Sequence, residues 1–401
     1  MNILIFSEYY YPERFLISEI AERLVEEGNR VTVVTGLPNY GFPNGEVLPE
    51  YKNGSHNNEV VNGVNILRCN VRGRKTGTIN LLINYFSYAV NANRLAKNID
   101  SDYDVIYLYQ LTPILQAFPA IQFAKKKKIP IVCYCLDLAP ECGQRLIGKY
   151  KLFGCLYARF SKWAYRQFNK VAVTSKAFIE YLSSVNKVDI DRICYLPQHA
   201  SDTLLKCDLC KYPTGSPRVF MFAGNIGKGP NLQNIVLAAD KVVHNGITDF
   251  QIQFVGGGSY KETLVKLVSD MQLNEYVKFF DAVPMHEMSD VYKRADALIV
   301  TLRKGQKTVP GKLQAYMATG KPIIASMDSS GREMIEEADC GICVPADDYV
   351  ALSEAISDYI ERPLSYQKYG ENGKKYFIEN FTINTHIMRL IDILHMVAND
   401  K

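Results

Sequence analysis

Apolar positions along the chain alternate between two spacings, and this alternation predicts the secondary structure. Short apolar runs with the length of buried strands precede stretches in which apolar residues recur at helical spacing. In the first half, strands are predicted at residues 2–7, 30–36, 61–72, 105–109, 130–136, 171–174 and 193–197, and helices at 16–27, 78–98, 114–127 and 155–170. Strands that alternate with helices favour right-handed crossovers and a parallel sheet. The first half therefore predicts an α/β domain.

The same alternation restarts after a polar, turn-rich stretch at residues 198–217, which we interpret as a linker between domains. The later strands are predicted at 219–223, 251–255, 277–280, 297–301, 322–325 and 341–344, and the helices at 232–245, 261–272, 286–294, 365–380 and 385–399. A chain of 401 residues exceeds what one hydrophobic core usually holds. Two domains are expected, at residues 1–200 and 201–375.

The composition is that of a folded protein, with 47% apolar and 22% charged residues and a net charge of +4. Seven basic residues and no acidic one lie between Cys142 and Lys170, which favours an anionic partner surface. The start of the chain lacks the basic lead of a secretory signal, and ten cysteines then indicate a reducing compartment. The uncharged residues 105–124 include polar residues and prolines, so we interpret them as a strand, a turn and a helix.

Residues 308–325 carry the most informative local pattern. A turn at Pro310 and Gly311 precedes a short helix, Gly320 ends that helix, and an apolar strand follows. The free amides of such a helix start attract anions, and a nucleotide diphosphate is a common anion at these sites in α/β proteins. The alternative is an ordinary connection between a helix and a strand.

The run from Pro310 to Ala325 resembles the donor-binding segment of family-4 retaining glycosyltransferases, which are GT-B enzymes that use nucleotide sugars. The resemblance continues in order along nearly the whole chain, through residues 2–13, 28–40, 137–141 and 224–228. Residues 137–141 are similar to the corresponding segment of one subgroup, with Ala139 in place of Trp. Residues 224–228 open the second half as that subgroup does. That subgroup builds O-antigen, capsular and colanic-acid-type polysaccharides and includes fucosamine transferases.

This resemblance implies a GT-B fold, in which two Rossmann-like, doubly wound domains with parallel sheets face a cleft. The first domain would bind the acceptor and the second the nucleotide sugar. The final helices would cross back, with residues 376–401 packing on the first domain.

The resemblance also assigns residues to the donor site. They lie in loops after predicted strands and at the helix start: Gly224, Asn225, Gly227, Lys228, Gly256, Val283, Pro310, Gly311, Lys312, Leu313 and Glu333. Glycine backbone can approach a diphosphate closely, and the amides around Gly311 would stabilise the diphosphate as it leaves. Val283 would cover the base. Glu333 would contact the donor or, alternatively, would be an acid favoured by a helix start.

The chain departs from the family pattern within this donor site. Asn225 and Pro230 stand in place of Arg and Lys, and Lys307 and Ala315 stand in place of a glutamate pair that contacts the donor sugar and ribose. Lys228 or Lys312 would therefore supply the positive charge. Recognition of the sugar and the ribose must rest on other groups.

Asp137 is the leading catalytic candidate. It directly follows the strand predicted at 130–136, at the end of the sheet where Rossmann-like domains place reactive groups. Its carboxylate would receive or orient the proton of an acceptor hydroxyl; the alternative is a cap for the following turn. Glu141 is a second, weaker candidate. Because no nucleophilic carboxylate is convincingly placed, retention is expected to proceed by same-face attack.

The sequence predicts neither a metal nor a cofactor. Two Asp-x-Asp triplets, at 102–104 and 189–191, come before predicted strands, so we interpret them as turn acids. Two Cys-x-x-Cys pairs, at 207–210 and 340–343, lie far apart and have no histidine at zinc-finger spacing.

Residues 155–170 predict a helix with two neighbouring stripes. A basic stripe with Arg159, Lys162 and Arg166 lies beside an aromatic stripe with Trp163, a combination that suits a helix in an anionic lipid interface. The alternative is a surface helix that buries its apolar face and solvates its basic one.

The resulting hypothesis is a retaining glycosyltransferase that moves an N-acetylated hexosamine or deoxyhexosamine from a UDP-sugar to a polyprenyl-diphosphate-linked saccharide. It would work in the cytoplasm, peripherally on the inner face of the membrane, and without nucleic acid. One alternative is a non-catalytic GT-B subunit, favoured by the missing glutamates. The other is a sugar-nucleotide epimerase, which would need a carboxylate and a histidine in the second domain.

Overall fold

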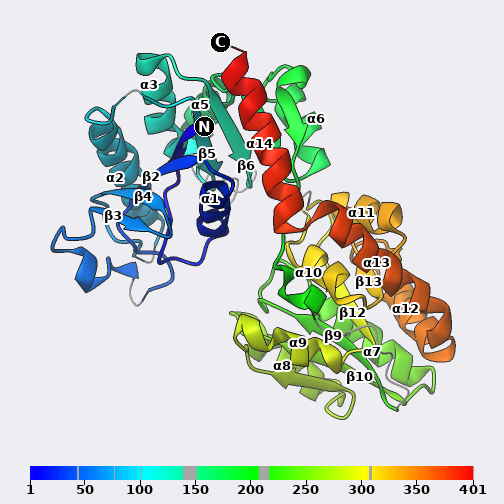
Figure 1. Ribbon diagram of the computed structural model, residues 1–401. Coiled ribbons are helices and arrows are strands. Elements are labelled where there is room, and N and C mark those ends of the chain that lie inside the picture. The colour runs from blue at the N-terminus through cyan, green and yellow to red at the C-terminus, as the bar shows by residue number, and fades with distance from the viewer. Residues whose placement is uncertain are drawn as a thin grey trace. The chain divides into compact units, whose positions relative to one another are not determined.

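The computed structural model describes residues 1–42, 45–75, 77–100, 102–138, 151–206, 216–306 and 309–400. Its contacts divide the chain into two compact units (Figure 1). The first contains residues 1–196 and 387–401, and the second contains residues 197–386. Each unit is an α/β domain built on its own sheet, which confirms the fold class predicted from the alternating pattern.

The sheet of the first unit has eight strands in the order β3-β4-β2-β1-β5-β6-β7-β8. The strands are β1 Asn2–Phe6, β2 Arg30–Gly36, β3 Asn58–Val61, β4 Val64–Cys69, β5 Val105–Gln110, β6 Ile131–Cys135, β7 Lys170–Val173 and β8 Ile193–Tyr195. All neighbours pair in parallel except β3 and β4. The order of strands reverses between β1 and β5, and ligands of such sheets bind at the carboxyl ends beside this switch point.

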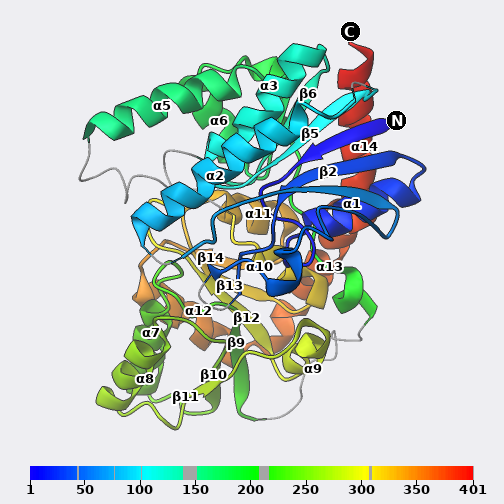
Figure 2. The same ribbon diagram turned by 90° about the vertical axis from the view of Figure 1, so that its left-hand side faces the viewer.

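Helices cover both faces of this sheet. They are α1 Ile17–Glu26, α2 Thr78–Ala96, α3 Ala117–Lys127, α5 Lys151–Tyr165, α6 Lys176–Ser184 and α14 Ile383–Asn399, with 3₁₀ turns η2 Pro49–Tyr51, η3 Ile114–Gln116 and η4 Ile190–Arg192. α2, α3 and α5 share one apolar core, and α1 and α14 lie on the opposite side of the sheet (Figure 2). Among the described residues, no helix combines the length and apolar content that a membrane span requires.

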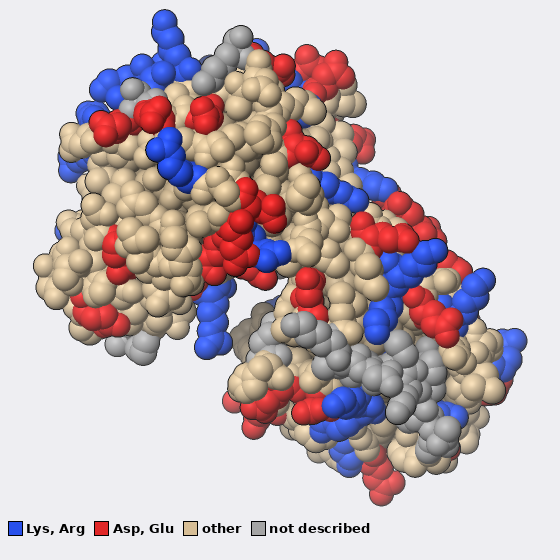
Figure 3. Space-filling view, in the orientation of Figure 1, with Lys and Arg blue, Asp and Glu red and all other residues tan. Residues whose placement is uncertain are grey.

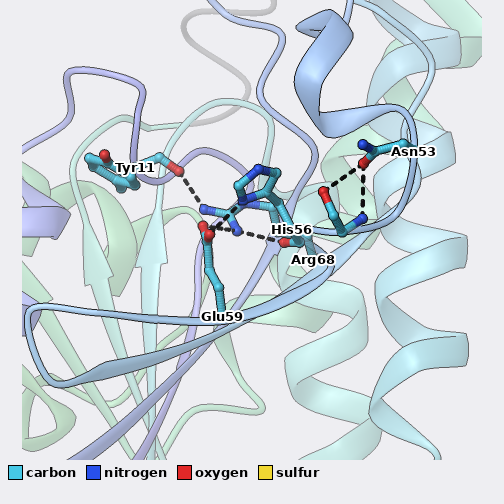
Figure 4. Close-up of polar contacts among 6 residues, drawn as sticks. Tyr11, Asn53, His56, Glu59 and Arg68 are labelled. Carbon is cyan, nitrogen blue, oxygen red and sulfur yellow. Dashed lines mark hydrogen bonds and ion pairs between the residues drawn. The ribbon is translucent and has the colours of Figure 1, made fainter.

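The prediction of a single strand at residues 61–72 was wrong. The chain forms a hairpin there, in which β3 pairs antiparallel with β4 through a turn at Asn62 and Gly63, both with positive φ. Asn-Gly is a strong signal for this two-residue turn, and the prediction overlooked it. Buried Arg68 anchors the hairpin: it forms an ion pair with Glu59 and donates to the Tyr11 carbonyl oxygen at 2.9 Å (Figure 4). The hairpin thus holds the loop that follows β1.

The sheet of the second unit has six parallel strands in the order β11-β10-β9-β12-β13-β14. The strands are β9 Arg218–Ala223, β10 Phe250–Val255, β11 Val277–Phe280, β12 Ala297–Thr301, β13 Ile323–Ser326 and β14 Gly341–Val344. Here the order reverses between β9 and β12, so the switch point of this sheet lies beside the end of β9.

Two apolar cores cover the two faces of this second sheet. The helices are α7 Gln233–His244, α8 Lys261–Asp270, α9 Met288–Lys293, α10 Lys312–Thr319, α11 Ser330–Ala338, α12 Tyr349–Glu361 and α13 Gln367–Asn380, with η5 Asp202–Lys206, η6 Met285–Glu287 and η7 Pro363–Tyr366. α11 and α12 were not predicted. α13 packs on α10 within this unit, and the crossing back to the first unit is made by α14, from Ile387 onward.

Candidate functional site

Glycine loops meet at the switch point of the second sheet. The loop after β9 begins at Gly224 and the loop after β10 at Gly256, with φ of 141° and 147°. The two loops are hydrogen-bonded, since the Gly224 amide donates to the Val255 carbonyl at 2.9 Å. A Cβ on Gly256 would lie 2.0 Å from the Gly224 carbonyl oxygen. This close approach requires glycine, and it leaves bare backbone at the end of β9.

The ammonium group of Lys312 lies over this bare backbone. A Cβ on Gly224 would be 3.1 Å from Lys312 Nζ, and Nζ is 3.8 Å from the centre of the Phe222 ring. Within the described ranges, no carboxylate forms an ion pair with Lys312, and burial lowers the pKa of Lys312 to about 8. The second unit thus holds an unpaired cation beside a loop that other chemical groups can approach closely.

Two helices begin near this lysine. Lys312 is the first residue of α10, and a Cβ on Gly331 in the first turn of α11 would be 3.3 Å from Pro310 Cδ. Ser329 caps α11 by accepting from the Gly331 amide at 3.2 Å, whereas α10 has no side-chain cap. An uncapped helix start next to a lysine suits an anion.

Gly311 differs from the prediction that glycine is needed there for a tight turn. Its φ is −58°, and a Cβ would meet nothing within 4 Å, so a residue with a side chain fits the backbone. Leu313 also differs, because its amide donates to the Pro310 carbonyl at 2.9 Å and is not free for a ligand. The absence of a side chain at Gly311 is therefore not required by the backbone, and its effect would be to leave room for a ligand at the start of α10.

The other predicted donor residues lie around this centre with weaker anchoring. Asn225 and Lys228 are exposed, and Lys228 is held by its carbonyl, which accepts from Arg303 Nε at 2.9 Å. Gly227 lies beside Asn225, because its Cβ would be 3.3 Å from Asn225 Nδ2. Of the two candidate lysines, Lys228 is thus exposed within the loop after β9, and Lys312 is the partly buried one over Gly224.

The remaining donor predictions fall in three different environments. Val283 is partly buried and packs on the apolar core beneath α10. Glu333 is exposed in the first turn of α11, where a donor contact and a favourable helix-start acid remain equally open. Ala315 is partly buried against the same core, and Lys307 lies outside the described residues.

The first unit places a different group at its switch point. Glu8, two residues after β1, is 2% exposed, and neither carboxyl oxygen has a hydrogen-bond partner in the described part of the chain. Burial raises the pKa of Glu8 to about 8, against the lowering influence of Tyr9 and Arg74. At neutral pH Glu8 is thus largely uncharged. The sequence analysis missed it, although its position directly after the first strand was a usable signal.

Arg74 stands above Glu8 in a ring of tyrosines. Its guanidinium lies 5.0–5.7 Å from the ring centres of Tyr9, Tyr40 and Tyr85. Nη1 donates to the hydroxyl groups of Tyr9 at 2.6 Å and Tyr85 at 3.0 Å. No carboxylate of the described chain pairs with Arg74. No local sequence pattern predicts this cluster, because its members come from distant segments.

Glu13 holds the two loops that carry Tyr9 and Tyr40. Its carboxylate accepts from the amides of Tyr10, Asn39 and Tyr40 at 3.2, 2.7 and 2.6 Å. Burial raises the pKa of Glu13 to about 7, and the three amide bonds oppose this shift. The loops after β1 and β2 are therefore fixed to each other.

Asp137 lies two residues beyond β6, at the carboxyl edge of the first sheet. Its carbonyl accepts from Gln110 Nε2 at 3.2 Å, and burial raises the pKa of its carboxyl group, opposed by the Thr112 side chain. The turn that this carboxylate would cap, from residue 139 onward, lies outside the described residues, so both roles predicted for Asp137 remain predictions. Glu141 lies outside the described residues.

The helix predicted at residues 155–170 is α5, and the aromatic residues Phe160 and Trp163 on it are partly buried. They pack against the core of the first unit. Arg159 and Lys162 are exposed on α5, and Arg166 is exposed just beyond its end. These three basic residues line a hollow together with Trp163 and Gln167. The basic residues of the predicted lipid contact are exposed, and Trp163 is partly buried beside them.

Two protein-family models match the chain, one in each half. Residues 16–199 match the Glycosyl transferase 4-like domain, and residues 212–376 match Glycosyl transferases group 1. Each half of the chain is thus similar to a domain described for glycosyl transferases. Over 344 residues it is 22% identical to the putative colanic acid biosynthesis glycosyl transferase WcaI of Escherichia coli K12, covering 80% of this chain and 82% of that protein. Four other curated glycosyltransferases are matched over only 36–44% of their own lengths.

Solved glycosyltransferase structures share the fold of the whole chain. Sucrose-phosphate synthase from Thermosynechococcus elongatus has a TM-score of 0.75 at 16% identity, with 100% of both chains covered. Anabaena Alr3699/HepE, solved in complex with UDP, has a TM-score of 0.69 at 13% identity, covering 99% of this chain and 100% of that one. At these identities the likeness establishes the GT-B fold.

Proposed function

We propose that the protein is a retaining glycosyltransferase that uses a UDP-sugar. One observation carries the proposal: the unpaired, partly buried ammonium of Lys312 lies over the glycine backbone at the end of β9, beside the uncapped start of α10. Burying an unpaired cation is unfavourable unless a ligand pairs with it. A diphosphate supplies the matching charge, and a related fold, HepE, was solved with UDP.

The same groups suit the chemistry of sugar transfer. As the bond between the sugar and the diphosphate breaks, negative charge grows on the leaving phosphate, and a fixed ammonium stabilises that charge. Asp137 is proposed to receive or orient the proton of the acceptor hydroxyl, since burial raises its pKa toward the range useful for proton transfer. Glu141 keeps its secondary role in this scheme. The acceptor attacks the face that the diphosphate leaves.

The acceptor is proposed to be a polyprenyl-diphosphate-linked saccharide, and the transferred sugar an N-acetylated hexosamine or deoxyhexosamine. The similarity to a putative colanic acid biosynthesis enzyme supports a role in surface polysaccharide synthesis. A lipid-linked acceptor places the protein on the cytoplasmic face of the membrane. The basic residues Arg159, Lys162 and Arg166 support contact with anionic lipid there.

Release of UDP from a panel of UDP-sugars, with a synthetic polyprenyl-diphosphate-linked N-acetylhexosamine as acceptor, tests the proposal. Acceptor-dependent release from one donor is expected. UDP binding without turnover of any donor would favour the non-catalytic alternative, and conversion of the sugar without UDP release would favour the epimerase.

The variant Gly311→Val separates ligand approach from folding. Since Gly311 has ordinary φ and open space around its Cβ position, the variant is expected to fold normally. Its side chain would obstruct a diphosphate at the start of α10, so the gain in melting temperature that UDP gives should be lost. An unchanged gain would move the diphosphate away from this helix.

A further inference from the structure

α2 presents an unpartnered apolar stripe to solvent. Ile79, Ile83, Phe86 and Val90 are 74%, 47%, 50% and 44% exposed, and their spacing of four, three and four residues places them on one face of the helix. The opposite face is buried, with Tyr88 and Ala92 in the core. Single exposed apolar residues are common on protein surfaces, but a continuous helical stripe of large ones marks an interaction surface.

The charges around α2 select the kind of partner. From Arg72 to Lys97 the chain contains five basic residues and no acidic one. Four of them flank the stripe, with Arg72 and Lys75 before the helix and Arg94 and Lys97 at its end, whereas the fifth, Arg74, is held by the tyrosine cluster. The partner must therefore accept apolar side chains in its middle and positive charges at both ends.

More basic residues lie on the same side of the sheet. α3 ends in Lys125, Lys126 and Lys127, and α3 packs between α2 and α5 in one core. Lys125 Nζ is 5.1 Å from the centre of the Trp163 ring on α5, so the basic end of α3 adjoins the basic residues of α5. Figure 3 shows Lys and Arg gathered over the first unit near α3.

We propose that the α2 stripe inserts into the interface of an anionic lipid bilayer, with the flanking basic residues and the end of α3 on the lipid head groups. This inference deepens the membrane contact in the proposed function and rests on it. A helix that lies in the membrane plane, with an apolar face and basic residues around it, binds anionic membranes through burial of apolar area and through attraction to the lipid charges. α5 alone offers less, because Leu156 is the single large apolar side chain exposed on its described part.

A second copy of the chain fits this face poorly. Two α2 helices packed antiparallel about a twofold axis would bring Arg72 and Lys75 of one copy to Arg94 and Lys97 of the other. Like charges would then meet at both ends of the apolar contact, which disfavours it. A bilayer with anionic head groups has the opposite charge.

Co-sedimentation with phosphatidylcholine vesicles, with and without phosphatidylglycerol, tests the proposal. The full chain should bind the anionic vesicles at low salt and bind the neutral ones weakly. Phe86→Asp should lower the partition coefficient about tenfold or more, because it removes a large apolar side chain from the lipid. The matched control is Ile378→Asp on α13, since Ile378 is 49% exposed in the second unit and should leave binding unchanged.

Charge reversal distinguishes α2 from α5. The double variant Arg94→Glu, Lys97→Glu should weaken binding at low salt severalfold. A larger loss in Arg159→Glu, Lys162→Glu with no loss in Phe86→Asp would overturn the proposal in favour of α5. A dimer that Phe86→Asp dissociates, without vesicle binding, would assign the stripe to a second copy.

These outcomes are separate from the transferase proposal. UDP binding in solution should be the same in wild type, Phe86→Asp and Ile378→Asp, because Phe86 belongs to the first unit and the exposed side chain of Ile378 is not among the donor-site residues. Failure of UDP binding in the wild type would defeat the transferase proposal alone. Failure of vesicle binding would defeat the role of α2 alone.

Discussion

The charged residues at the switch points of the two sheets have different environments. In the second unit, Lys312 holds a buried positive charge over bare backbone, with no carboxylate pair in the described chain. In the first unit, Arg74 is also without a carboxylate pair, yet two tyrosine hydroxyls and three aromatic rings satisfy it. Glu8 below it is largely uncharged at neutral pH because burial raises its pKa to about 8.

This difference indicates what each site needs. Aromatic faces and hydroxyl groups stabilise a guanidinium without a counter-ion, so the first site is complete without an anion. The second site is complete only when an anion arrives. A diphosphate donor in the second unit, and the uncharged saccharide part of the proposed acceptor near the first, are consistent with this contrast.

Replacing Lys312 removes the cation that distinguishes the second site from the first, and it has the largest expected effect on turnover. Lys312→Met should lower turnover by roughly 10³-fold, as loss of a group that stabilises leaving-group charge does. The same change should raise the melting temperature of the ligand-free protein, because Met removes a buried charge. Turnover and thermal unfolding measured on one preparation check both. Lys228→Met, at an exposed lysine of the neighbouring loop, is the control. Equal losses in the two variants would contradict the central position of Lys312.

Asp137→Asn tests the chemistry of the first unit. If Asp137 receives or orients the acceptor proton, turnover should fall roughly 10²-fold while UDP binding stays intact. Steady-state kinetics with saturating acceptor, together with calorimetry for UDP, would show this. Both measurements are needed, because a variant that loses turnover and UDP binding together has lost its fold. Near-normal turnover would reduce Asp137 to a residue of the loop.

The candidate donor site of the second unit could largely be predicted from the sequence, whereas the cluster of the first unit could not. The parts of the donor site are local: a glycine after β9 and a Pro-Gly-Lys run at the start of α10 can be read from short segments. The periodic pattern also gave most strands and helices. The cluster in the first unit consists of Glu8, Tyr40, Arg74 and Tyr85, which only the folded sheet brings together.

The error at residues 61–72 and the open prediction for α5 have physical explanations. The single strand at 61–72 overlooked the Asn-Gly turn, which is a local signal. The lipid-facing aromatic stripe on α5 stays a prediction, because periodicity shows that a helix has an apolar face but not what covers that face. Trp163 is partly buried against the core, whereas Phe86 on α2 is half exposed. Only the packing of α2, α3 and α5 in the folded protein distinguishes the environment of Trp163 from that of Phe86.

Glu8→Gln sharpens the comparison through stability. Between about pH 4.5 and pH 8 the native protein keeps a proton on Glu8 that the unfolded chain releases, so the free energy of unfolding falls as pH rises through this window. Without that carboxyl group, the fall between about pH 6.5 and pH 9 should shrink by about 2 kcal/mol. Urea unfolding at several pH values measures it. The exposed Glu50, changed to Gln, is the control. Identical pH slopes in wild type and Glu8→Gln would show that Glu8 is charged in the native state.

The smallest expected effect is on the pH dependence of UDP binding. Burial lowers the pKa of Lys312 to about 8, so its charged fraction falls from about nine-tenths at pH 7 to about one-tenth at pH 9. UDP keeps its charge in this range. If the ammonium holds the diphosphate, the Kd for UDP should rise up to about tenfold between these pH values, as calorimetry can measure. Lys312→Arg should flatten the curve, because a guanidinium stays charged. An equal slope in that variant would assign the titration to another group and leave the donor site without its defining cation.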